Sequence, residues 1–99
     1  MSRPKNYWFF ISKNMILRYD QIKTGKSKQE KTWTKAIEQA LEDTSKMENG
    51  DYKIKAIKAV LFEKRLTPIG AAEEIFYSER SVRQWVNDFI KDVGRKAGY

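Results

Sequence analysis

The stretch LTPIGAAEEIFYSERSVRQWVNDFIKDVG, residues 66–94, contains two helix starts separated by a short break. Thr67 followed by Pro68 predicts an N-cap with proline at the first helical position, so we expect a short helix over 68–75. Ser78 predicts the cap of a longer helix over 78–93, and Glu79 in its first turn suits the helix dipole. A short helix, a break and a longer capped helix together form the outline of a helix-turn-helix.

The longer helix separates apolar side chains from hydrogen-bond donors. One apolar sector of its helical wheel holds Val82, Trp85, Val86, Phe89 and Val93, and Trp85 is expected to be its core anchor. The opposite face carries Arg80, Arg83, Gln84, Asn87 and Lys91, with carboxylates only at its flanks. Arg, Gln and Asn can read purine edges through paired hydrogen bonds, whereas a merely solvated face usually interleaves charges of opposite sign. The pattern favours a DNA-binding helix, with contacts from Ser78, Glu79, Arg80, Ser81, Arg83, Gln84, Asn87 and Lys91.

Basic residues are concentrated upstream of this pair of helices. The 99-residue chain has a net charge of +7, and residues 1–66 hold 15 Lys and Arg against 8 Asp and Glu, while residues 67–99 hold 5 of each. Such an excess favours a polyanionic partner, nucleic acid before membrane. Asp51 predicts the cap of a helix over 52–66 whose outer side supplies phosphate contacts. The basic residues expected to make these contacts are Lys53, Lys58, Lys64 and Arg65.

The rest of the sequence predicts two more helices and no strands. Apolar spacing indicates a helix over 7–23 and another that begins near the N-cap Thr32 and ends near Met47, with Gly50 as a left-handed cap after it. Residues 24–31 form a polar, basic connector. We therefore expect one all-α domain of about five helices over 1–99, with an N-terminal part (7–50) and a DNA-binding part (51–99).

The helix over 7–23 is unusually rich in aromatic side chains. They could form a stacking platform for single strands, but aromatics at helical spacing are more often core. The apolar circumference is wide, so the sequence leaves open whether this is the central helix of the monomer or also packs across a homodimer. The aromatic residues are Tyr7, Trp8, Phe9, Phe10 and Tyr19.

Catalytic and metal chemistry find no support in the composition. The chain has neither His nor Cys, so the usual proton shuttle, thiolate nucleophile and zinc cluster are missing. Gly25-Lys26-Ser27 matches the end of a phosphate loop, but the preceding glycine and strand are absent. We expect no enzyme, no cofactor and no metal site. No apolar run reaches the length of a membrane span, and we expect no signal peptide.

The stretch 66–94 also resembles the helix-turn-helix of phage-encoded late transcriptional activators of the RinA and ArpU type, which are similar to the DNA-reading part of sigma factors. The resemblance lies in the threonine-led short helix and in Phe76-Tyr77-Ser78-Glu79-Arg80 before the amphipathic helix. It implies recognition through Glu79, Arg80, Arg83 and Gln84, a contact with RNA polymerase, and the cytoplasm of a bacterial host. One departure is Phe76, where many such turns have glycine.

The expected function is sequence-specific binding of double-stranded DNA by a phage or prophage regulator. The alternative is a phage structural protein, such as a small packaging subunit that docks DNA as a ring-like oligomer. A third interpretation, a helical protein-interaction module, predicts no measurable affinity for DNA at low salt.

Overall fold

The computed structural model describes residues 7–98, and all regular structure in this range is helical. It contains six α-helices and one π-helical turn, packed as a single body, which confirms the predicted all-α class. In chain order the elements are α1 (Tyr7–Leu17), α2 (Tyr19–Ile22), α3 (Lys28–Ser45), α4 (Gly50–Ile57), the π-helical turn η1 (Lys58–Phe62), α5 (Pro68–Ile75) and α6 (Glu79–Lys96). None of the helices in this part of the chain is long and apolar enough to cross a membrane.

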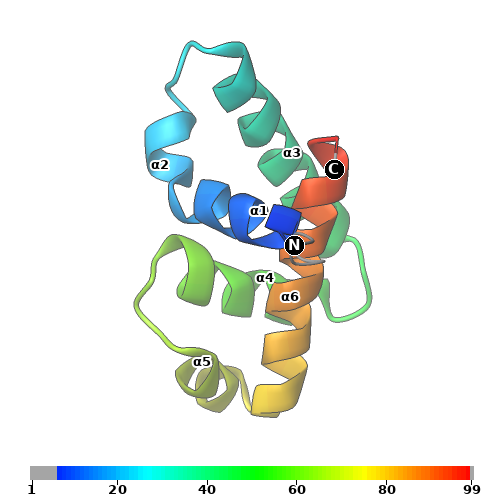
Figure 1. The fold of residues 1–99 in the computed structure, drawn as a ribbon. Helices are drawn as coiled ribbons and strands as arrows, with labels where there is room; N and C mark the ends of the chain where they lie inside the picture. The colour runs from blue at the N-terminus through cyan, green and yellow to red at the C-terminus, as the bar shows by residue number, and fades with distance from the viewer. Residues whose placement is uncertain (1–6, 99) are drawn as a thin grey trace, which may run out of the picture.

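The long C-terminal helix α6 is the element on which the others assemble. It packs against α1, α3, α4 and α5, and α1 crosses its C-terminal half while α5 lies beside its N-terminal end (Figure 1). Because α6 is strongly amphipathic, one side supplies a large share of the core. Its buried apolar residues are Val82, Val86, Phe89, Ile90 and Val93.

Two features of the predicted apolar sector of α6 need correction. Trp85 is only partly buried, so the prediction that it anchors the helix in the core is wrong. Ile90, which the predicted sector omitted, is 1% exposed and takes that role. The reason is that α1 covers the side of α6 where Ile90 lies, so the buried sector is shifted away from Trp85.

The contact between α1 and α6 is unusually close. The Ser12 hydroxyl, fully buried, donates a hydrogen bond of 2.7 Å to the backbone carbonyl of Ile90. Gly94 lies directly under the Trp8 ring, since a Cβ at that position would come within 2.8 Å of it. A glycine on one helix and a small polar residue on the other therefore let α1 lie flat on α6.

The aromatic residues of the first predicted helix lie at different depths. Trp8, Phe9 and Tyr19 are partly buried, Phe10 is 60% exposed, and the side chain of Tyr7 lies outside the described residues. Tyr19 donates a 2.8 Å hydrogen bond to Glu38 and meets Phe62 edge to face at 5.5 Å. Burial, followed by that hydrogen bond, raises the pKa of Tyr19 to about 12. The central helix of the fold is thus α6 rather than this one.

The N-terminal helices differ from the prediction at their ends. The single helix expected over 7–23 breaks at Arg18, and α2 turns so that Ile22 is buried against α3. The cap of α3 is Ser27 rather than Thr32. Ser27 accepts from the Glu30 amide at 3.1 Å and the Glu30 carboxylate accepts from the Ser27 amide, which is a complete capping box.

The link from α3 to α4 also differs from the prediction. Asn49, not Gly50, adopts the left-handed conformation, with φ 58°. Gly50 is buried and begins α4, and a Cβ there would lie 2.4 Å from the Ser45 carbonyl oxygen. Glycine is therefore required at 50 by close approach of two backbones, and Asp51 lies inside the helix rather than capping it.

The helix expected over 52–66 ends early. The α-helical hydrogen bonds stop at Ile57, the turn η1 follows, and the chain leaves helical geometry after Phe62. The amides of Arg65 and Leu66 both donate to the carbonyl of Ala59, at 3.1 and 3.3 Å, and Lys64 is left-handed with φ 56°. These bonds cap the helix and turn the chain back toward α5.

Candidate nucleic-acid interface

The helix-turn-helix outline appears in the structure as α5, a linking turn and α6. Thr67 caps α5 by accepting from the Gly70 amide at 3.3 Å, with Pro68 at the first helical position. Ser78 caps α6 by accepting from the Ser81 amide at 3.1 Å. Both predicted caps are confirmed, and α6 continues to Lys96, beyond its expected end at 93.

Phe76 supplies the left-handed residue that the turn requires. Its φ and ψ are 61° and 39°, and the Tyr77 amide donates to the Ala72 carbonyl at 3.0 Å across it. This is the helix-ending arrangement in which glycine usually occupies the left-handed position. The Phe76 side chain is 94% exposed. The turn therefore keeps the geometry of a glycine turn, although a phenylalanine occupies it.

Small side chains bring α5 close to α6. Ala71, Ala72 and Ile75 are 1%, 4% and 6% exposed, and Val82 at the start of α6 is 0% exposed. The helix formed by α4 and η1 packs on both. The first turns of α6 are therefore held rigidly by two neighbours on one side, while the opposite side faces solvent.

The exposed side of α6 carries an uninterrupted set of donors. Arg80, Gln84, Asn87 and Lys91 are all exposed, and none of them forms a hydrogen bond or an ion pair with another described residue. Their spacing of three and four residues places them on one stripe. No carboxylate lies within the stripe, because Asp88 and Asp92 fall toward the side of α4 and α3.

Arg83 does not belong to the middle of this stripe. Its guanidinium pairs with the Glu79 carboxylate one turn earlier, and it lines a hollow with Val86 and Ile90 at the border of the apolar sector. Glu79 is therefore engaged as an ion-pair partner as well as lying near the helix N-terminus. The hydroxyls of Ser78 and Ser81 lie 2.9 Å apart within the cap.

Two cations that the sequence did not single out lie beside this surface. Lys13 of α1 lines the same hollow as Arg83 and Asn87, a position that only the tertiary contact between α1 and α6 creates. Arg95 follows Lys91 by one turn and is exposed, although it also pairs with Asp92 at 3.7 Å. Arg95 could have been predicted on this surface, because it follows Lys91 by four residues on the same helix. Lys13 could not, because nothing in its local sequence indicates that α1 packs beside this part of α6.

The four basic residues predicted to contact phosphates have unequal surroundings. Lys58 and Lys64 are exposed and have no ion pair with a described residue. Arg65 forms two hydrogen bonds with Glu74, at 3.0 and 3.1 Å, and a third with Glu63. These bonds raise the pKa of Arg65, and the guanidinium lowers the pKa of Glu74. Among the described residues, the one polar contact of the Lys53 ammonium is with the Met47 sulfur, at 3.9 Å, and Lys53 lines a cavity between α4 and α6.

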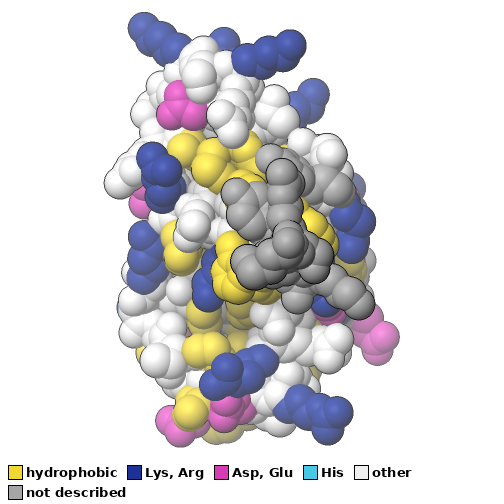
Figure 2. Space-filling view, in the orientation of Figure 1, with side chains coloured by type: hydrophobic (Ala, Val, Ile, Leu, Met, Phe, Trp, Pro, Cys, Tyr) yellow, Lys and Arg dark blue, Asp and Glu magenta, His cyan; other side chains and the backbone are white. Residues whose placement is uncertain are grey.

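On the face drawn in Figure 2, positive charge is spread rather than gathered. Figure 2 shows Lys and Arg side chains around the edge of one face, with apolar side chains across its middle. Among the described residues there is no cluster of three or more His, Cys, Asp or Glu that could hold a metal ion. What the arrangement offers chemically is hydrogen-bond donation from α6 and positive charge around it.

Comparison with known proteins adds no relative to this picture. No family model, no curated protein and no solved structure matches the chain.

Proposed function

We propose that this chain is a sequence-specific binding protein for double-stranded DNA that reads the major groove with the first turns of α6. The observation that carries the proposal is the stripe of Arg80, Gln84, Asn87 and Lys91, which are exposed and have no hydrogen-bond or ion-pair partner among the described residues, on a helix whose opposite side is held by α5 and α4. A donor row without internal partners keeps its hydrogen-bonding capacity for a ligand. In a helix-turn-helix, the N-terminal residues of the second helix contact base edges.

The division of labour along α6 follows from this geometry. Arg80 and Gln84 lie in the first two turns and are assigned to base edges, because paired donors match guanine and adenine. Asn87 and Lys91 lie further along the helix and are assigned to the sugar-phosphate backbone. Arg83 is assigned to the edge of the contact, where its guanidinium is shared with Glu79. The net charge of +7 supplies a sequence-independent attraction for the duplex.

The biological role within the proposal is regulation of transcription in a phage or prophage, in the cytoplasm of a bacterial host. The resemblance of residues 66–94 to the RinA and ArpU type supports this role and a contact with RNA polymerase. A packaging subunit would use the same helix to dock DNA. The oligomeric state in solution distinguishes the two roles. Packaging requires a ring-like oligomer, whereas regulation requires a monomer or dimer that protects a promoter-sized site.

Selection of duplexes from a random pool tests the proposal and supplies the site. We expect an enriched motif. On that motif, Arg80→Ala should weaken binding by about 1–3 kcal/mol and should weaken binding to random DNA by less, because a base contact is lost. Lys91→Ala is the matched control on the same stripe and should weaken both by similar amounts. Titration of each variant against both duplexes by fluorescence anisotropy gives the four affinities.

The competing outcomes are distinct. A pool that shows no enrichment despite tight binding would reduce α6 to a phosphate-binding face. An absence of binding at low salt would favour the protein-interaction module. Neither variant should change the melting temperature, since both side chains lie on the solvent side of α6.

A further inference from the structure

A second surface of the molecule is apolar and aromatic, and it is separate from the donor stripe. We call it the Trp85 face, and it consists of Met47, Tyr52, Tyr77 and Trp85. Tyr52 contacts Tyr77 with ring centroids 5.3 Å apart, and Tyr77 contacts Trp85 at 4.9 Å. Met47 is 50% exposed and Tyr52 is 48% exposed. Exposed apolar side chains that adjoin one another mark an interaction site more often than isolated ones do.

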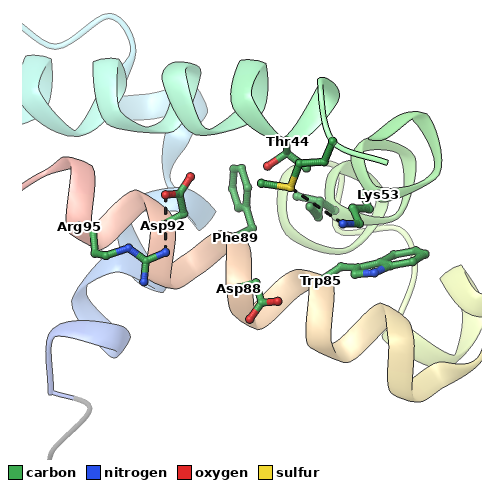
Figure 3. A pocket seen from close by; sticks show the side chains of 9 residues that line it. Thr44, Lys53, Trp85, Asp88, Phe89, Asp92 and Arg95 are labelled. Carbon is green, nitrogen blue, oxygen red and sulfur yellow. Dashed lines mark hydrogen bonds and ion pairs between the residues drawn. The ribbon is translucent and has the colours of Figure 1, made fainter. Parts of the chain in front are cut away.

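A cavity of about 270 Å³ opens in this face, between the end of α3, α4 and α6. Its floor is apolar, because Ile57 and Phe89 line it and are 1% and 2% exposed. Figure 3 shows Trp85 on one wall, with Lys53 reaching from α4 and Asp88 projecting from α6. The cavity is large enough for one apolar side chain.

The charges around the cavity balance, unlike those of the whole chain. Lys53 and Arg95 oppose Asp88 and Asp92 on the rim, whereas the whole chain carries a net charge of +7. Asp92 is already bound, at 3.1 Å from Lys96 and 3.7 Å from Arg95. Lys53 and Asp88 have no ion pair with a described residue. Both charges remain available, one on each wall.

We propose that the Trp85 face is a two-fold interface between two copies of this chain, in which Lys53 of each copy pairs with Asp88 of the other. Two molecules of net charge +7 repel each other over most of their surface. The Trp85 face offers contact without that repulsion, and it presents both signs, as self-pairing requires. In a two-fold interface, residue i meets residue j and j meets i, so the Lys53–Asp88 pair forms twice. An exposed apolar side chain of the opposite copy, such as Met47, fills the cavity.

The proposed interface borders the donor stripe of α6. Trp85 and Asp92 line the cavity with residues of α4 and α3, whereas Asp88 is exposed one turn from both Gln84 and Lys91. Self-association can be measured without DNA, so its test does not depend on the proposed function.

Charge reversal of each partner tests the pairing. Sedimentation equilibrium of the full chain over micromolar to high micromolar concentrations should show a monomer–dimer equilibrium. Lys53→Asp and Asp88→Lys should each raise the dimer dissociation constant at least about tenfold, because each places two like-charge pairs in the interface. An equimolar mixture of the two variants should associate again, with a dissociation constant within about threefold of the original. Only contacts between copies can produce that recovery.

The controls reverse charge elsewhere to the same net value. Asp20→Lys and Lys31→Asp lie on α2 and α3, away from the cavity, and should leave the dissociation constant within about twofold. Far-ultraviolet circular dichroism confirms that each variant is folded. A parent chain that stays monomeric at all concentrations overturns the proposal. So does a dimer that both reversals leave unchanged, which would move the interface to the α1 surface at Phe10, or a mixture that remains monomeric.

Discussion

Phe76 adopts a left-handed backbone conformation that a residue of its kind disfavours, with φ 61°. Residues other than glycine, asparagine and aspartate lose about 1–2 kcal/mol in the left-handed region, because Cβ crowds the backbone. Nothing in the described structure compensates this cost, since the Phe76 ring is 94% exposed. Phe76 therefore lowers the stability of the fold, and strained backbone positions of this kind often occur at functional sites.

Replacement of this residue should stabilise the protein. Phe76→Gly should raise the free energy of unfolding by about 0.5–1 kcal/mol, the relief of left-handed strain less the extra chain entropy of glycine. Phe76→Ala is the matched control, because it removes the ring but keeps the Cβ, and it should not be more stable than the parent. Urea unfolding of the three proteins gives the comparison. Equal stability of the glycine and alanine variants would mean that the strain is small.

At the scale of single residues, the sequence was informative where a local rule decides the structure. Thr67, Pro68 and Ser78 behave as their capping chemistry predicts, because a cap depends on neighbours two or three positions away. Trp85 and Gly50 could not be placed in this way. The depth of Trp85 depends on which side of α6 the helix α1 covers, and Gly50 is determined by contact with the Ser45 carbonyl.

Helix ends show the same contrast at the scale of elements. Two hydroxyl residues, Ser27 and Thr32, precede the apolar spacing of α3, and the prediction named only Thr32 as the cap. The capping box with Glu30 selects Ser27, and Thr32 instead donates to the Lys28 carbonyl at 2.9 Å inside the helix. The S-x-x-E spacing was present in the sequence and was the deciding signal.

The two hydroxyls should therefore differ on removal. Ser27→Ala should lower the free energy of unfolding by about 1 kcal/mol, because the Glu30 amide loses its acceptor. Thr32→Ala should be neutral or slightly stabilising, since alanine is the better helix former in a helix interior. Thermal unfolding of both variants by circular dichroism measures the difference. The reverse order of stabilities would return the cap to Thr32.

Interruptions within predicted helices were the least predictable features at this scale, whereas α3 and α6, 18 residues each, were both predicted as helices. Apolar spacing continues through Arg18 and past Phe62 to Leu66, so periodicity alone predicts unbroken helices over 7–23 and 52–66. The structure breaks both where the chain must turn to bury Ile22 in one case and to reach α5 in the other. Those turns are determined by the elements that they meet, which no local window contains.

At the scale of the whole molecule, net charge describes the protein less well than the pairing of its charges. The positive charge of Arg65 is balanced by ion pairs with Glu74 and Glu63. Lys58 and Lys64 form no ion pair with a described carboxylate. All three residues were predicted as phosphate contacts without distinction. The Arg65–Glu74 ion pair could not be read from the sequence, because Arg65 lies in the loop after η1 and Glu74 lies in α5.

Salt dependence should distinguish the free cations from the paired one. Replacing Lys58 and Lys64 together by Gln should reduce the slope of log affinity against log salt concentration by about 1–2, if each cation releases about one counterion. Arg65→Gln should change the slope little, because its charge is already balanced. Anisotropy titrations at several salt concentrations give the slopes. An unchanged slope for the double variant would place the phosphate contacts elsewhere, with Lys13 as the first candidate.

The close contact of α1 with α6 limits how parts of this chain can be exchanged with parts of another protein. Arg80 and Gln84 of α6 are exposed to solvent. Further along the same helix, the Ile90 carbonyl accepts a hydrogen bond from Ser12, and Gly94 lies against the Trp8 ring. The end of α6 that carries the exposed donors and the end that packs against α1 are therefore two parts of one continuous helix. A chimera joined at residue 50 should therefore be unstable. Its C-terminal part would lack α1, and the apolar side of α6 that α1 covers would be exposed to water.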